Sequence, residues 1–66
     1  MTPMIGQIFY VPTAECLENP PTPYRYRVLR SHRDAGYWEC VCEAGGHPAR
    51  HNSICVYAGR EIEKLS

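Results

Sequence analysis

Hydrophobic and polar residues alternate over several short stretches of the chain, and this period of two predicts β-strands. Residues 24–29 (YRYRVL) place an aromatic or aliphatic residue at every second position, with arginines at most of the positions between them. Such alternation is typical of a strand with one face buried and the other in solvent. Residues 37–43 (YWECVCE) follow a turn at residues 33–36 (RDAG), so we expect the two stretches to form a hairpin.

The rest of the chain predicts shorter elements on either side of this hairpin. Residues 5–11 (IGQIFYV) are rich in β-branched and aromatic residues and end at Pro12, which predicts a first strand. Residues 12–23 hold four prolines and predict a long loop, with one turn of helix at residues 13–18. After a turn-rich connection, the C-terminal part predicts a strand at residues 53–57 (SICVY), a single 3₁₀ or α turn at 58–61 and a last strand at 62–65 (IEKL).

Counting along the hairpin assigns its two faces, because successive side chains of a strand point to opposite sides. The core face is predicted to carry Tyr26, Val28, Trp38, Cys40 and Cys42. The outer face carries opposite charges that meet across the strands, namely Arg25, Arg27, Glu39 and Glu43. In the same register Ile54 and Val56 point inward. Tyr37 and Tyr57 point outward.

This succession of short strands, with a long loop after the first and a helical turn before the last, resembles that of the SH3-like small barrels. The resemblance covers most of the chain and rests on strand order. It implies one all-β domain over residues 1–66, a five-stranded SH3-like barrel with one 3₁₀ turn before the last strand. Closing the sheet removes exposed edges that invite aggregation. The alternative is an open antiparallel sheet packed on a short helix at residues 13–18.

A narrower resemblance covers residues 36–65 (GYWECVCEAGGHPARHNSICVYAGREIEKL). This segment is similar to the C-terminal half of the plasmid-borne type II dihydrofolate reductases, SH3-like chains that assemble as a tetramer around one pore. A Val-Gln-Ile-Tyr run lines the pore in that family, and Ile54, Cys55, Val56 and Tyr57 occupy the corresponding place here. Cys55 replaces the family's functional glutamine, so the resemblance supports fold and self-association more than reductase activity. General similarity to small barrels of phages and mobile elements is at least as good.

Length and charge limit the possible functions. A chain of 66 residues buries only about 60% of its unfolded surface, so a disulfide, a metal or self-association is expected to help stabilise it. Seven basic residues balance seven acidic ones, which removes long-range attraction to phosphate. No stretch has the length of a membrane helix or the pattern of an export signal, so we expect a soluble, cytoplasmic protein without a membrane partner. In that compartment its four cysteines are thiols or metal ligands rather than disulfides.

The best chemical pattern is the segment CVCEAGGHPARH. It contains the array Cys40, Cys42, His47 and His51, whose side chains are of the kinds that hold Zn²⁺ in a tetrahedron. A structural zinc is therefore one hypothesis, and Cys16 can replace one ligand. The competing interpretation places both cysteines in the core and both histidines in a solvated loop, and disulfide pairing is a third.

Catalytic patterns are weaker. A nucleophile and its base would be supplied by Cys55 with His51 or His32, but the sequence places no third group to orient the base. Glu39 and Glu43 lie four apart on one strand face, which is typical of solvated surface. We therefore expect a module that acts without catalysis and without a cofactor other than the hypothetical zinc.

The predicted function is a small binding or adaptor module for a protein partner. Tyrosine supplies large amphipathic area at low entropic cost, and the predicted partner-binding residues are Tyr10, Arg25, Arg27, Tyr37 and Tyr57, beside the loop at 12–23. One alternative is a nucleic-acid-binding barrel, in which Tyr24 and Tyr26 stack on bases between arginines at 25, 27, 30 and 33. An oligomeric enzyme of the type II reductase kind is the other. A homo-oligomer is compatible with each.

Overall fold

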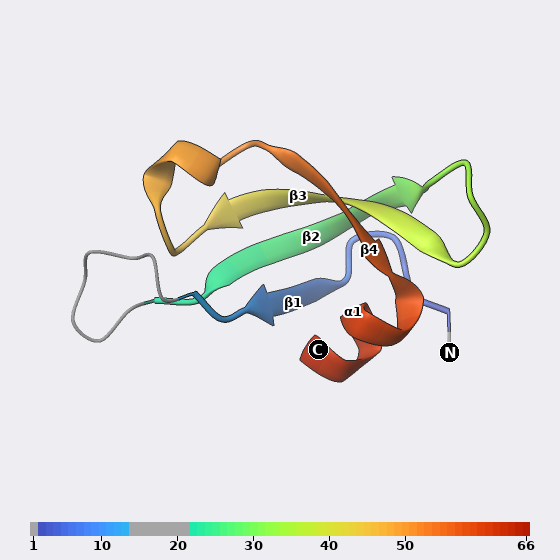
Figure 1. Ribbon diagram of the computed structural model, residues 1–66. Helices are drawn as coiled ribbons and strands as arrows, with labels where there is room; N and C mark the ends of the chain where they lie inside the picture. The colour runs from blue at the N-terminus through green and yellow to red at the C-terminus, as the bar shows by residue number, and fades with distance from the viewer. Residues whose placement is uncertain (1, 14–21) are drawn as a thin grey trace.

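The computed structural model describes residues 2–13 and 22–66 of the chain. They form a four-stranded antiparallel sheet in the order β1-β2-β3-β4, followed by one helix (Figure 1). The strands are β1 (Ile8–Val11), β2 (Tyr24–Ser31), β3 (Tyr37–Ala44) and β4 (Ile54–Ala58). A 3₁₀ turn η1 (Pro48–Arg50) lies between β3 and β4, and the helix α1 (Gly59–Leu65) follows β4 directly. None of the helices in the described residues is long and apolar enough to cross a membrane.

The hairpin of β2 and β3 confirms the strongest sequence pattern. Val28 pairs with Cys40 and Tyr26 with Cys42, so these four side chains share the inner face as predicted. Gly36 takes the positive φ of 83° that the turn requires. A register shift between Val28 and Arg30 marks a bulge in the middle of β2.

The first strand is shorter than predicted, because a turn occupies its expected beginning. Gly6, at φ 87°, turns the chain before β1 begins at Ile8. The main chain still runs beside β2 there: the Gly6 N–H donates to the Val28 carbonyl over 2.8 Å, and the Val28 N–H donates to the Gln7 carbonyl over 2.9 Å.

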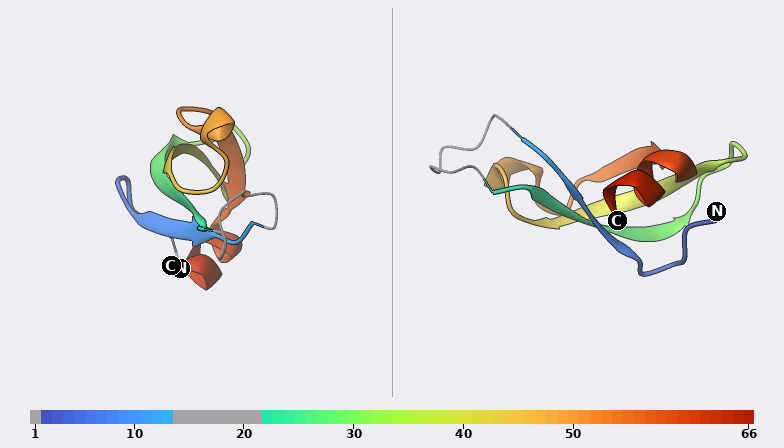
Figure 2. Two further views of the ribbon diagram at one scale, coloured as in Figure 1. Left: turned by 90° about the vertical axis from the view of Figure 1, so that its left-hand side faces the viewer. Right: turned by 90° about the horizontal axis from the view of Figure 1, so that it is seen from below.

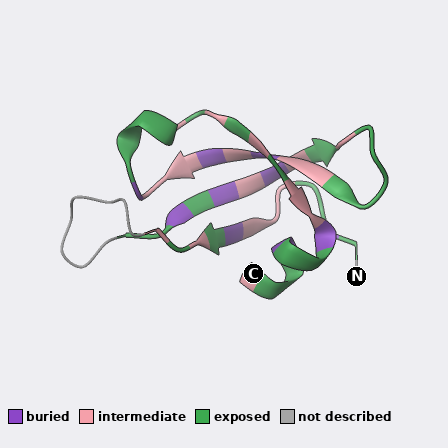
Figure 3. Cartoon of the chain, viewed as in Figure 1, coloured by how far each residue is buried: buried purple, intermediate pink, exposed green. Residues whose placement is uncertain are grey.

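The core lies on the concave face of a strongly curled sheet. Phe9 of β1 and Tyr57 of β4 belong to the two outermost strands, yet their ring centroids are 5.3 Å apart. Tyr26 lies between them, 5.6 Å from Phe9 and 5.2 Å from Tyr57. The fully or almost fully buried apolar residues are Phe9, Tyr24, Tyr26, Val28, Cys40, Cys42 and Ile62 (Figure 3).

The predicted fifth strand at residues 62–65 is wrong, since these residues belong to α1. In a helix Ile62 and Leu65, three positions apart, share one face, and both pack against the core. An extended chain would point them to opposite sides. The helix contacts the two edge strands, β1 and β4 (Figure 2).

The described residues are therefore mostly β, as predicted, but they form an open sheet with a helix and not a five-stranded barrel. The alternative of an open sheet packed on a short helix matches the described architecture, in which α1 is the helix. The helical turn predicted at residues 13–18 lies almost entirely outside the described residues.

The strand β4 has the opposite facing from the one predicted. Cys42 pairs with Ser53, and Cys40 with Cys55, so even-numbered residues of β3 lie opposite odd-numbered residues of β4. Paired residues share a face, which turns Cys55 and Tyr57 inward. The predictions that Ile54 and Val56 point inward and Tyr57 outward are wrong. The length of the loop between Cys42 and Ser53 decides which residues of β4 face inward, and alternation within the strand alone cannot decide this.

Candidate functional site

The four predicted zinc ligands lie in two different environments. Cys40 and Cys42 are completely buried on the inner face of the sheet. His47 caps η1, where its Nδ1 accepts a hydrogen bond from the Ala49 N–H over 3.1 Å, and the Nε2 of His51 lies 2.8 Å from the Gly45 carbonyl. Within residues 2–13 and 22–66, no three histidine, cysteine or carboxylate side chains gather as a metal site. Cys16 lies outside these residues, and zinc binding stays a prediction.

The buried thiols are held in the protonated form. Burial, followed by the nearby Cys55, raises the pKa of Cys40 to about 11. Burial also raises the pKa of Cys42. A thiol is a nucleophile only as the thiolate, so neither group is activated for attack.

The cysteine and histidine pairs proposed for nucleophilic chemistry are not brought together. The Sγ of Cys55 lies 3.7 Å from the hydroxyl of Tyr26, in the inner aromatic cluster. His51 contacts the Gly45 carbonyl, and His32 lies near the carboxylates of Asp34 and Glu39.

The arginines of β2 lie on the outer face as predicted, where they pair with carboxylates of β3. Arg27 Nε contacts Glu43 Oε2 at 2.7 Å, and Arg25 Nε lies 3.6 Å from the other oxygen of the same carboxylate. Arg30 pairs with Glu39 at 3.1 Å. The hydrogen bond from Arg27 is the main cause that lowers the pKa of Glu43. Three arginines share two carboxylates in this ladder, so most of its positive charge is compensated before any phosphate approaches.

The predicted tyrosines separate into two groups. Tyr10 and Tyr37 are about half exposed, as expected of binding residues. Tyr57 packs edge-on against the rings of Phe9 and Tyr26, and burial raises its pKa. Tyr57 is therefore partly buried against the core on the inner face, away from the outer face where it was predicted.

Apolar side chains occupy most of the outer face of β3 and β4, where they meet the ion-pair ladder at Glu39. The register brings Tyr37 opposite Ala58 and Val41 opposite Ile54, while Val56 lies opposite Glu39. We call this surface, made by Tyr37, Val41, Ile54, Val56 and Ala58, the β4 patch. Ile54 and Val56 are 47% and 45% exposed, although both are strongly hydrophobic.

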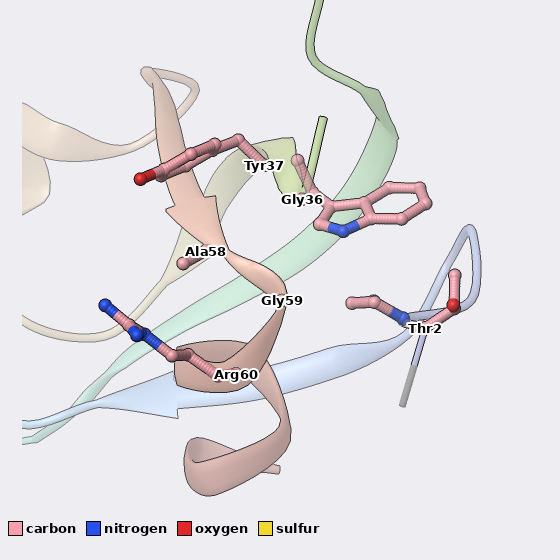
Figure 4. A pocket seen from close by; sticks show the side chains of 8 residues that line it. Thr2, Gly36, Tyr37, Ala58, Gly59 and Arg60 are labelled. Atoms are coloured by element: carbon pink, nitrogen blue, oxygen red, sulfur yellow. The ribbon is translucent and has the colours of Figure 1, made fainter. Parts of the chain in front are cut away.

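A shallow pocket of about 460 Å³ lies where the β4 patch ends. Its lining residues come from three segments, and they are Thr2, Pro3, Gly36, Tyr37, Trp38, Ala58, Gly59 and Arg60. Figure 4 shows the side chains of Tyr37 and Arg60 extending in the same direction on either side of Ala58. Gly59 is buried, and a Cβ built on it would lie 3.4 Å from both the Trp38 indole nitrogen and the Pro3 ring. Gly59, the first residue of α1, therefore lies against both rings.

The pocket is lined by several hydrogen-bond donors and, among the described residues, by no carboxylate. Arg60 is exposed and makes no ion pair with any described residue, and the lining contains no carboxylate. The Trp38 indole N–H makes no hydrogen bond to the described residues either. The pocket is suited to acceptor groups, carboxylates above all.

Sequence reasoning missed Ile54, Val56 and Arg60 as surface-site residues. The residues 54–58 (ICVYA) lack any charge, and that signal is visible in the sequence. An uncharged stretch predicts a buried strand as readily as an exposed apolar one. The site could therefore be found only once the pairing register of β3 and β4 was known. Comparisons of the chain with protein-family models, with curated proteins and with solved structures return no match.

Proposed function

We propose that this protein is a non-catalytic module that binds a protein partner through the β4 patch. The observation that carries the proposal is the exposure of Ile54 and Val56 on the outer face of an edge strand. Exposed apolar side chains that border charged residues, as Val56 borders Glu39 here, are typical of protein interfaces. Tyr37 adds an amphipathic ring at one end of the patch.

The alternative of a nucleic-acid-binding barrel receives less support from the same surface. Three of the arginines that were expected to contact phosphates, Arg25, Arg27 and Arg30, pair with Glu39 or Glu43. Tyr24 and Tyr26, expected to stack on bases, are buried. The relation to SH3-like barrels remains part of the proposal, on the grounds of strand order and the curled sheet.

Site-specific photocrosslinking in the native host tests the proposal. A benzophenone amino acid replaces Val56 in one variant and Lys64, an exposed residue of α1, in the control. We expect a discrete protein adduct from position 56 and none from position 64. With the purified partner, Val56→Lys should weaken binding at least about tenfold, because a charge would be desolvated in an apolar interface.

Lys64→Glu is the matched control and should bind as the wild type does. Equal melting temperatures of both variants would show that folding is intact. Adducts to nucleic acid from position 56, or undiminished partner binding by Val56→Lys, would contradict the proposal. Sedimentation of the protein as a clean monomer would separately exclude the tetrameric reductase alternative.

A further inference from the structure

The strand β4 carries backbone hydrogen-bonding groups that point away from the sheet. The Cys42 N–H bonds to the Ser53 carbonyl and the Gly59 N–H to the Gly36 carbonyl, so Ser53 and Gly59 face β3 at the two ends of the strand. Because this orientation alternates, Cys55 and Tyr57 also face β3. Ile54 and Val56 therefore direct their N–H and C=O groups to the other edge, and Ala58 directs its N–H there.

That edge is free among the described residues. The sheet order places β4 at its end, and no described loop or helix residue forms a hydrogen bond with the backbone of Ile54 or Val56. Ala58 is the N-cap of α1, so its carbonyl belongs to the helix. The strand contains no proline and no charged residue, the features by which proteins protect exposed edges. An unprotected edge of this kind can accept another strand.

The pocket beside Arg60 lies at the Ala58 end of this edge. A strand added antiparallel to β4 would begin near Arg60 and continue past Ala58, Val56 and Ile54. Residues opposite these three would lie on the outer face with the β4 patch. A residue at the start of the added strand would meet the guanidinium of Arg60, which makes no ion pair with a described residue.

We infer that β4 binds an extended peptide segment of the partner as an added antiparallel strand. The segment has an acidic side chain followed by apolar residues at alternating positions. This inference rests on the proposed function and specifies how the β4 patch is used. Main-chain hydrogen bonds to Ile54, to Val56 and to the N–H of Ala58 hold the peptide, and Arg60 selects the acidic residue.

A second copy of the chain fits this edge less well. If two β4 strands paired antiparallel about Val56, Arg60 of each would lie opposite Asn52 of the other. Shifting the centre of the strand pairing by one residue in either direction brings Arg60 opposite Ile54 or Arg50. Residues 50–54 (RHNSI) contain no carboxylate, so self-pairing would leave Arg60 without an acidic partner in all three registers.

A synthetic peptide of this design tests the inference. The probe is Ac-Glu-Ser-Val-Thr-Val-Thr-Val-NH2, with its middle valine opposite Val56. Because Trp38 is the only tryptophan and lines the pocket, its fluorescence reports binding directly. We expect saturable binding, together with slower amide hydrogen exchange at Val56. N-methylation of the middle valine should weaken binding about 5- to 10-fold, since it removes one hydrogen bond and obstructs the edge.

Charge exchange tests the role of Arg60. Replacing the glutamate of the probe with lysine should lower affinity about 2- to 5-fold, and Arg60→Glu should reverse the preference. The control variant Arg33→Glu, at an exposed position in the turn between β2 and β3, should retain the preference for the glutamate probe. Equal affinity of the N-methylated probe, or no preference for glutamate, would overturn the inference.

The outcomes also separate this inference from the proposed function. Partner binding that requires Val56 but leaves its amide exchange unchanged would show side-chain docking without strand addition, and would overturn only the inference. A dimer that Val56→Lys abolishes would show that a second copy occupies the edge instead. Either result leaves the crosslinking experiment as an independent test of whether the β4 patch binds a protein.

Discussion

The facing of β4 predicts a sharp contrast between two neighbouring residues, Tyr57 and Val56. Tyr57 makes two edge-on aromatic contacts, with Phe9 at 5.3 Å and Tyr26 at 5.2 Å. Two such pairs contribute about 1–3 kcal/mol beyond burial, and the space left by truncation adds roughly 1–2 kcal/mol. We therefore expect Tyr57→Ala to lower the free energy of unfolding by about 2–5 kcal/mol.

Val56→Ala should change the free energy of unfolding by about 0.5 kcal/mol or less, because the valine is 45% exposed on the outer face. A domain of this size has a total stability of roughly 3–10 kcal/mol, so Tyr57→Ala is expected to be poorly folded at room temperature. Tyr57→Leu retains apolar volume and provides a milder variant that can be measured.

Urea unfolding followed by circular dichroism measures the contrast. With a slope of about 1 kcal/mol per molar urea, a loss of 2 kcal/mol moves the midpoint by about 2 M. The midpoint should hardly move for Val56→Ala. If Val56→Ala were the more destabilising of the two, the even-numbered residues of β4 would face the core and the described register would be refuted.

Further predictions concern the helix, the loop and two titrating groups. Ile62→Ala should cost about 2–5 kcal/mol in urea unfolding, because Ile62 is completely buried, and a cost below about 1 kcal/mol would contradict the docking of α1. Gly45→Ala should cost about 1–3 kcal/mol or more, since the glycine has φ 75° and an added Cβ would lie 1.9 Å from a backbone oxygen; a neutral effect in thermal unfolding would argue against this loop conformation. The raised pKa of Cys40 favours the neutral thiol in the fold, so stability should be full below about pH 9 and be lost as the pH rises from 9 through about 11, a decline that Cys40→Ala should reduce. The lowered pKa of Glu43 has the opposite sign: its contribution is present above the ordinary glutamate pKa and is lost as the pH falls through the lowered value, so acid titration of Glu43→Gln should show a smaller loss than the wild type.

The sequence alone determined the elements whose signal is local. Alternation located the hairpin of β2 and β3, its turn at Gly36 and the inner face with Tyr26, Val28 and Cys40. It also predicted the ladder of opposite charges on the outer face, because side chains on one strand face recur at every second residue wherever the strand lies.

Tertiary structure decided the features that depend on how distant segments meet. Residues 62–65 alternate like a strand, but only as a helix do Ile62 and Leu65 both reach the core. Likewise, the facing of β4 depends on which residue of β3 is paired after the intervening loop, and a shift of one residue exchanges the two faces. That exchange buried Tyr57 and exposed Ile54 and Val56, so the candidate binding surface follows from strand pairing and could not be read from the local pattern.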